Sequence, residues 1–422
     1  MLIKKNKFNS VFVGIVLALL SFEAQILTSI LTTTRLSLIL LLLLNFLLFF
    51  KGVKFSISKY LLVIISFFGF IILWCVINIF YSLVIGSTIY IIPLSSIILI
   101  MVSVIMLSFI IEKNNIDIYI IIRTLWLIGS LTIYITLLLL IYNAEFNIFD
   151  SNVRLSILKR YFNDTLVSGT SRFFYGLIVL NIFSIGYTFG YLRKVKKYTR
   201  LVSSINIVII TILLVFANSR QNLLLLIFVI IVGKLMSYRL VSVIKVVFKI
   251  SIVLGLLLFI LSATTNIIPL IKEKYIERTT KQLKQGSERT ETYKNAIDDM
   301  LSYPIFGVGL GNFQKNHGIT THNGYLWVGS ELGIFPLLIY FIFILWVILT
   351  YNKVKYLKND YQKIAKLLFV FIIGYLLISN NFNELFKDYI FYSVLILYLS
   401  LFNEVNISEE KKLINKHQKK IK

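Results

Sequence analysis

A histidine at the start of an apolar run is the residue in this sequence best suited to acid–base chemistry. His322 follows Thr321 and precedes Asn323-Gly324, and Glu331 comes nine residues later. The other two histidines, His317 and His417, lie in a glycine-rich turn and a lysine-rich tail. An imidazole, with its ordinary pKa of about 6.5, can act as a general base near neutral pH. The alternative for His322 is a helix cap or an interface residue.

Two arginines have the chemistry to bind phosphate groups. Arg220 stands in Asn218-Ser219-Arg220, a polar break between two apolar runs, and Arg289 follows Ser287-Glu288. A guanidinium binds phosphate through two parallel hydrogen bonds and stays protonated. A lone arginine between apolar segments is costly unless it meets a partner or a polar cavity. The alternative for Arg220 is a side chain that only extends to the membrane interface.

A glycine-rich segment, Gly307-Val308-Gly309-Leu310-Gly311-Asn312-Phe313, precedes the histidine. Glycines at this density allow positive φ angles or a close approach of the backbone. Successive N–H groups in such a segment could hold an anion, and the alternative is a tight turn back to the membrane. A metal site is not expected, because Asp298-Asp299 lies on a predicted amphipathic helix and no other paired-aspartate motif is near.

The composition decides which elements position these residues. The chain has 422 residues, of which 58% are hydrophobic and 15% charged, with a mean hydropathy of +0.86. Soluble domains carry about 25% charged residues, so an ordinary cytosolic enzyme is excluded, and disorder is excluded by the high hydrophobicity. We expect one integral membrane domain over 1–422, an all-α polytopic membrane protein with about twelve transmembrane helices. The expected spans are 10–31, 36–50, 60–82, 88–111, 117–142, 172–192, 201–217, 221–237, 246–268, 325–350, 365–382 and 386–403.

The basic residues predict the orientation of these spans. With both termini cytoplasmic, every short loop obeys the rule that lysine and arginine stay inside. The net charge of +24, from 43 basic and 19 acidic residues, is then a topology signal, and nucleic acid is not expected as a partner. The single cysteine, Cys75, excludes a disulfide within the chain.

Two predicted outer loops are long, at 143–171 and 269–324, and the second lies before span 10. Within it, Ser287 is a good N-cap, and acidic residues in the first turn favour the helix dipole. Apolar residues then recur at helical spacing, and Pro304 follows. This pattern predicts an amphipathic helix over 288–302 that lies against the outer membrane face.

Together, these stretches resemble the O-antigen ligase and polysaccharide polymerase family of bacterial membrane glycosyltransferases. The resemblance covers residues 215–345 and rests on three motifs in order. They are Asn218-Ser219-Arg220, then Ser287-Glu288-Arg289 with Pro304–Phe313, then His322-Asn323-Gly324-Tyr325-Leu326 with Glu331-Leu332-Gly333. The first half of the chain is similar to the family only in hydropathy.

The resemblance implies an all-helical enzyme that joins sugars at the outer face, with a glycan on a polyprenyl diphosphate as donor. His322 would then be catalytic, and Arg220 and Arg289 would bind the diphosphate. Many relatives have an Asn-Pro-Asn-like element where this chain reads Ser168-Gly169-Thr170-Ser171-Arg172, and Arg172 would be a further phosphate contact. Supporting roles would fall to Ser219, Gly307, Gly309, Asn323 and Glu331.

The leading hypothesis is a polymerase of repeat units for capsule, exopolysaccharide or O-antigen in the bacterial cytoplasmic membrane, without a cofactor. Its partners would be the polyprenyl-diphosphate-linked oligosaccharide, the acceptor glycan, a chain-length regulator and a flippase. A ligase that transfers the finished glycan to a final acceptor would use the same donor chemistry. A glycolipid transporter is the alternative from another class, because ionisable residues such as Glu23 and Arg123 lie within predicted spans.

Overall fold

The computed structural model describes ten stretches of the chain. They are residues 7–20, 39–40, 58–84, 92–113, 116–143, 170–188, 196–216, 219–237, 288–381 and 391–402. The predicted span at 246–268, nearly all of the span at 36–50 and most of the predicted loop at 143–171 lie outside the described residues, as does the lysine-rich tail.

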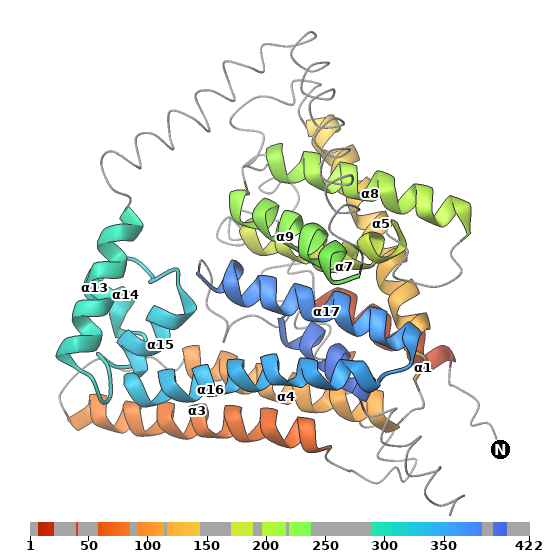
Figure 1. The fold of residues 1–422 in the computed structure, drawn as a ribbon. Helices are drawn as coiled ribbons and strands as arrows, with labels where there is room; N and C mark the ends of the chain where they lie inside the picture. The colour runs from red at the N-terminus through yellow and green to blue at the C-terminus, as the bar shows by residue number, and fades with distance from the viewer. Residues whose placement is uncertain are drawn as a thin grey trace, which may run out of the picture.

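Every element in the described residues is a helix (Figure 1). Five helical segments are long and apolar enough to cross a membrane. They belong to α3 (Lys59–Val84), α4 (Ile92–Lys113), α5 (Ile118–Asn143), α8 (Lys197–Phe216) and α16 (Ile334–Thr350), which runs into the 3-10 helix η3 (Tyr351–Tyr356). The remaining predicted spans and the count of twelve stay predictions.

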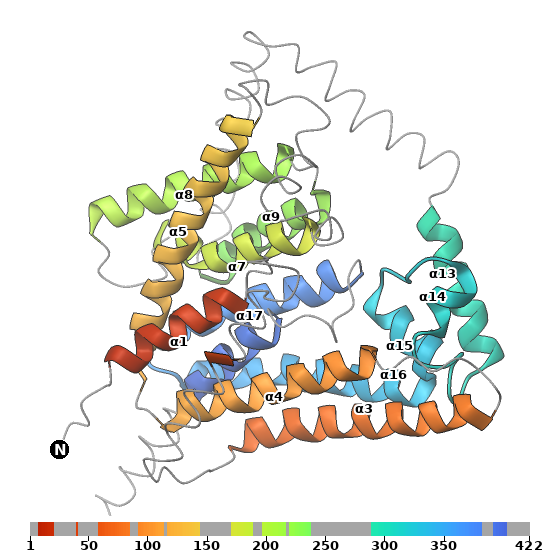
Figure 2. The same ribbon diagram turned by 180° about the vertical axis from the view of Figure 1, so that it is seen from behind.

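The other apolar helices of the described residues do not meet the combined criteria of length and hydropathy for a membrane span. They are α1 (Lys7–Leu20), α7 (Thr170–Thr188), α9 (Arg220–Ser237), α17 (Asn359–Leu377) and a last helix at Phe391–Phe402. In Figures 1 and 2, α3, α4 and α16 run side by side, and α17, α9, α7 and α8 follow above them. The helices are therefore packed as one bundle, with α5 inclined across it next to α1 and α7.

A buried polar network joins α5, α7 and α8. The Asn206 side chain is wholly buried, and its Nδ2 donates to Ser130 Oγ at 2.7 Å and Ser184 Oγ at 3.2 Å. Asn181 Nδ2 donates to the Gly129 carbonyl at 3.3 Å. In a membrane, hydrogen bonds between helices contribute to association because lipid offers polar groups no partner. This network therefore connects three helices that follow one another in the described part of the chain.

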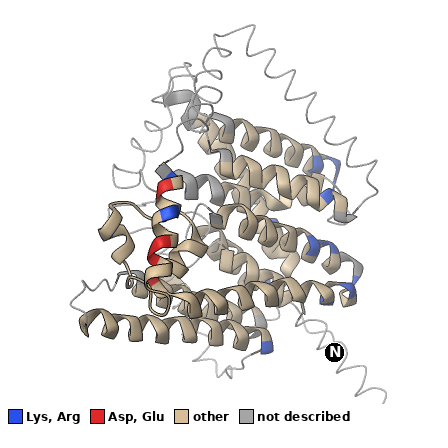
Figure 3. Ribbon diagram, turned by 60° about the vertical axis from the view of Figure 1, so that its left-hand side comes forward, with Lys and Arg blue, Asp and Glu red and all other residues tan. Residues whose placement is uncertain are grey.

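Charged side chains separate along the bundle (Figure 3). Lysine and arginine gather at one end, at the starts of α3 and α8 and around η3 and the start of α17. α13 (Glu288–Ser302), which carries four acidic residues and two basic ones, lies at the opposite end. We call these the basic end and the cap end.

The predicted span at 325–350 is corrected by the structure: it is two helices. α15 (Gly324–Leu332) and α16 meet at Gly333, where φ is 89°. The Ile334 N–H donates to the Pro304 carbonyl at 2.8 Å, and a Cβ on Gly333 would lie 2.1 Å from the Ile305 carbonyl oxygen. Hydropathy could not reveal this break, because no polar residue marks it.

Candidate active site

Residues 288–333 form a small unit, here called the cap, at the cap end of the bundle. It consists of α13, α14 (Asn312–His317), α15 and the segments that join them. α13 occupies the residues over which the sequence predicts an amphipathic helix. Ala296, Val308 and Phe313 are buried together, with Leu326 packed against them. The cap therefore has its own apolar centre. It contacts the bundle through α15, which packs against α3 and α16.

Side chains of α3 hold the glycine-rich segment of the cap through hydrogen bonds. Asn78 Oδ1 accepts the Leu310 N–H at 2.8 Å, and its Nδ2 donates to the carbonyls of Phe306 and Glu331. Trp74, one turn earlier on α3, donates through Nε1 to the Leu332 carbonyl at 2.8 Å. Two side chains of a membrane helix thus fix both the glycine-rich segment and the end of α15.

Glu331 of α15 also binds this segment. Its side chain is 3% exposed, and Oε2 accepts the Gly311 N–H at 2.7 Å. The N–H groups of Gly307, Val308 and Gly309 donate to the carbonyls of Tyr303, Ser330 and Glu331. Every N–H from Gly307 to Gly311 therefore binds a group of the protein itself. Of the two readings of this segment, the structure favours the tight turn over an anion nest.

Gly307 and Gly309 are needed for conformation. Their φ angles are 66° and 100°, a region that side chains rarely adopt. A Cβ on Gly307 would lie 2.5 Å from the Ser330 carbonyl oxygen, and a Cβ on Gly309 would lie 2.7 Å from Ser82 Oγ. Their absence of side chains lets the turn contact α15 and α3 closely.

His322 lies between two anchored neighbours. Thr321 and Asn323 are buried, whereas His322 is exposed. Asn323 caps α15, since its side-chain oxygen accepts the N–H groups of Tyr325 at 2.9 Å and Leu326 at 3.1 Å. Thr320 Oγ1 lies 3.3 Å from both ring nitrogens of His322.

The backbone at His322 is strained. Its φ is 50°, and among the described residues it is the one non-glycine residue with a positive φ. Such a conformation costs about 1–3 kcal/mol and persists only where the surroundings impose it. Here the Asn323 cap and the Thr321 Oγ1 bond to the Asn323 carbonyl impose it. These two contacts hold the exposed imidazole of His322 in a fixed place just before α15.

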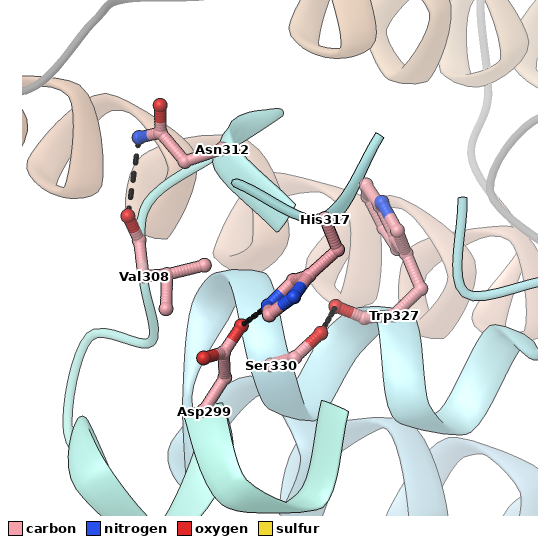
Figure 4. A network of polar contacts seen from close by, with 6 residues as sticks. All are labelled: Asp299, Val308, Asn312, His317, Trp327 and Ser330. Carbon is pink, nitrogen blue, oxygen red and sulfur yellow. Dashed lines mark hydrogen bonds and ion pairs between the residues drawn. The ribbon is translucent and has the colours of Figure 1, made fainter. Parts of the chain in front are cut away.

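His317 has a different environment, shown in Figure 4. Its Nε2 lies 2.9 Å from Asp299 Oδ2 (Figure 4). Its ring also packs against Phe313, with centroids 4.6 Å apart. This pair joins α14 to α13. Among the described residues, no group of three or more His, Cys, Asp or Glu side chains lies together in a way that could hold a metal.

The predicted phosphate-binding arginines begin or nearly begin three helices. Arg220 is the first residue of α9, Arg172 the third of α7 and Arg289 the second of α13. Arg289 is exposed, and it shares the cap with His322. The side chains of Arg220 and Arg172 lie outside the described residues. Ser219 is nearly buried and accepts the Asn222 Nδ2 at 2.9 Å, so it supports the start of α9.

Both α9 and α15 contact the last part of α17 or the 3-10 helix that follows it. A Cβ on Gly374, near the end of α17, would touch Leu225 and Phe228 of α9. Tyr325, at the start of α15, donates its hydroxyl to the Leu376 carbonyl at 2.9 Å. The short 3-10 helix η4 (Ser379–Asn381) follows α17 and contacts both α9 and α15. The helix that begins with Arg220 and the helix that begins two residues after His322 therefore both contact α17 or η4.

Sequence reasoning missed two groups that build this region. One is Asn78 with Trp74, and the other is Ser379-Asn380 of η4. The available signal was polarity in an apolar context, because Asn78 interrupts a long apolar run and Ser379-Asn380 ends the predicted span 365–382. A polar side chain at such a place needs a specific partner.

These features define an all-helical, multi-pass membrane protein with a polar cap over one end of its bundle. Residues 205–341 match a family model described as O-antigen ligase, which confirms the resemblance found in the motifs. The match includes Arg220, Arg289 and His322 but neither Arg172 nor η4. No curated protein matches the chain. The family implies a membrane glycosyltransferase of the O-antigen ligase and polymerase type, with a polyprenyl-linked glycan as substrate.

Proposed function

We propose that the protein polymerises polysaccharide repeat units at the outer face of the bacterial cytoplasmic membrane. It transfers the glycan from a polyprenyl-diphosphate donor to a hydroxyl of an acceptor sugar. The observation that carries the proposal is the exposed His322, held with a positive φ next to α15, which contacts η4 as α9 does. A strained residue on an anchored loop is a common property of functional sites.

In the proposed reaction, His322 removes the proton from the acceptor hydroxyl as the oxygen attacks the anomeric carbon. The bond between that carbon and the diphosphate oxygen breaks, and the diphosphate leaves with the electron pair. Arg220 and Arg289 stabilise the leaving charge through bidentate hydrogen bonds, with Arg172 as a third contact. General base catalysis of this kind contributes about 10²–10⁴-fold in rate. No metal or other cofactor takes part in this scheme.

The orientation is part of the proposal. Lysine and arginine gather at the end of the bundle opposite the acidic residues of α13 (Figure 3), and basic residues are enriched on the cytoplasmic side of membrane proteins. The basic end therefore faces the cytoplasm and the cap faces outward. A flippase would supply the donor on that side, and a chain-length regulator would act on the product.

The test is glycan length in a host that lacks the gene, complemented with the wild type, His322→Ala or His317→Ala. Membrane levels of each variant are measured in parallel. We expect His322→Ala to match the deletion, with single repeat units on the final acceptor, and His317→Ala to restore long chains. Long chains accumulating on the lipid carrier in the deletion would instead identify a ligase. A His322→Ala variant that behaves as wild type would refute the catalytic role.

A second variant tests the phosphate contact. Arg220→Lys keeps the positive charge but loses the planar pair of donors. We expect donor binding by the purified protein to weaken at least tenfold. Full activity in this variant would rule out the bidentate contact.

A further inference from the structure

Three polar side-chain atoms of η4 are buried without a hydrogen-bond partner. Ser379 and Asn380 both have 0% exposure, and Ser379 Oγ, Asn380 Oδ1 and Asn380 Nδ2 make no hydrogen bond. A buried polar atom without a partner costs about 1–3 kcal/mol. Buried polar groups in native proteins nearly always have a partner, so three such atoms in two consecutive residues require an explanation.

The position of η4 adds a second observation. It contacts α9, which begins with Arg220, and α15, which begins two residues after His322. The Asn380 amide also faces the phenol groups of Tyr325 and Tyr340, although neither amide atom reaches hydrogen-bond geometry with them. The unpartnered atoms therefore belong to a short helix that contacts both the helix beginning with Arg220 and the helix that follows His322.

We propose that Ser379 and Asn380 bind hydroxyl groups of the donor sugar that is attached to the diphosphate. This assignment rests on the proposed function and adds a sugar-binding site to it. An amide offers one donating and one accepting group side by side, and a sugar hydroxyl both donates and accepts. A phosphate only accepts, so it would leave Asn380 Oδ1 unpaired. The chemistry of the pair therefore matches the sugar better than the diphosphate.

Tyr325 is the side chain that the sugar displaces. Of the two rings that face Asn380, Tyr340 is wholly buried and Tyr325 is partly exposed. Tyr325 is held at this place by its hydroxyl bond to the Leu376 carbonyl. In this proposal the Tyr325 ring rotates away from the Asn380 amide and gives up its hydroxyl bond to the Leu376 carbonyl.

The experiment measures binding of two probes to the purified full-length protein. One probe is the polyprenyl-diphosphate-linked glycan extracted from cells that lack the gene, and the other is bare polyprenyl diphosphate. Asn380→Ala and Ser379→Ala are compared with Asn206→Ala, which removes an equally buried asparagine in the α5, α7 and α8 network. Asn380→Asp serves as a further variant of nearly unchanged shape, should the alanine variant fail to fold.

We expect Asn380→Ala to bind the glycan-bearing probe roughly tenfold more weakly, the equivalent of one or two hydrogen bonds. Binding of bare polyprenyl diphosphate should stay unchanged, and Asn206→Ala should bind both probes as the wild type does. Equal weakening for both probes would overturn the sugar assignment, as would wild-type binding of the glycan by Asn380→Ala. Failure of the wild type to bind either probe would instead overturn the proposed function itself.

Discussion

The cap and the α5, α7 and α8 network both depend on a buried asparagine, but the two asparagines have different partners. Asn206 binds the hydroxyl groups of Ser130 and Ser184 on neighbouring helices. Asn78 binds the backbone of a turn that has no regular structure of its own. In the network, the helices already satisfy their own backbone groups. The Asn206 amide therefore contributes only to the association of one helix with another. In the cap, the Asn78 amide accepts a hydrogen bond from the Leu310 N–H of the glycine-rich turn. It thereby fixes the position of that turn.

This difference predicts that small changes in the cap affect activity, whereas comparable changes in the network affect mainly stability. The largest effect is expected for Gly307→Ala. Its Cβ would lie 2.5 Å from the Ser330 carbonyl oxygen at a φ of 66°, so the turn cannot stay in place. We expect loss of glycan transfer, with a cap that proteases cut while the bundle remains intact.

Two other glycines provide matched controls for this variant. Gly318→Ala has a φ of 69° but open space around the new Cβ, so it isolates the backbone strain of about 1 kcal/mol. Gly69→Ala lies within α3 with nothing near it and should retain full activity. If Gly69→Ala were as damaging as Gly307→Ala, the effect could not be assigned to the close contact in the cap.

The next effect compares the two asparagines directly. Asn78→Ala leaves the Leu310 N–H buried and unpaired, at a cost of about 1–3 kcal/mol, and shifts the turn beside α15. We expect transfer activity per folded molecule to fall roughly tenfold. Asn206→Ala should lower the free energy of unfolding by a similar amount, seen as a lower unfolding temperature. It should leave the activity of the folded protein unchanged. The comparison fails if Asn206→Ala reduces the activity of folded protein as much as Asn78→Ala does.

A smaller effect separates positioning from chemistry at Glu331. Glu331→Gln keeps an oxygen for the Gly311 N–H and loses the charge, whereas Glu331→Ala loses both. Hydrogen bonds to charged groups contribute about 1.5–3 kcal/mol and neutral ones about 1 kcal/mol. The glutamine variant keeps a neutral bond and the alanine variant keeps none, so we expect the glutamine variant to be the more active of the two. Rates of transfer by purified protein test this. Equal loss in both variants would mean that the carboxylate charge itself is needed.

The smallest effect is expected for Asp299→Asn. The Asp299–His317 pair is partly exposed, and such pairs contribute at most about 1 kcal/mol. The variant should lower the unfolding temperature slightly and change the transfer rate by less than about twofold. A loss as large as that of His322→Ala would make the pair part of the reaction instead.

Local features of the cap were predictable from the sequence, and longer-range ones were not. Ser287, the acidic first turn and Pro304 predicted a helix at 288–302, where α13 lies, because caps and breakers act within a few residues. Glu331 lies on α15, which begins just after His322, but its carboxylate binds the Gly311 N–H. The break at Gly333 was missed, because the Ile305 and Pro304 carbonyls that require it come from another segment.

The sequence by itself determined the membrane helices, the glycine-rich turn, and the order of the arginine and histidine motifs that marks the family. Each of these is a matter of composition or of neighbouring residues. Only the tertiary structure decided that Asn78 of α3 holds Leu310, 232 residues away, and that η4 lies against both α9 and α15. Hydropathy places a residue inside the membrane but does not choose its neighbour. That choice depends on how distant helices pack and on which buried polar groups find partners when they do.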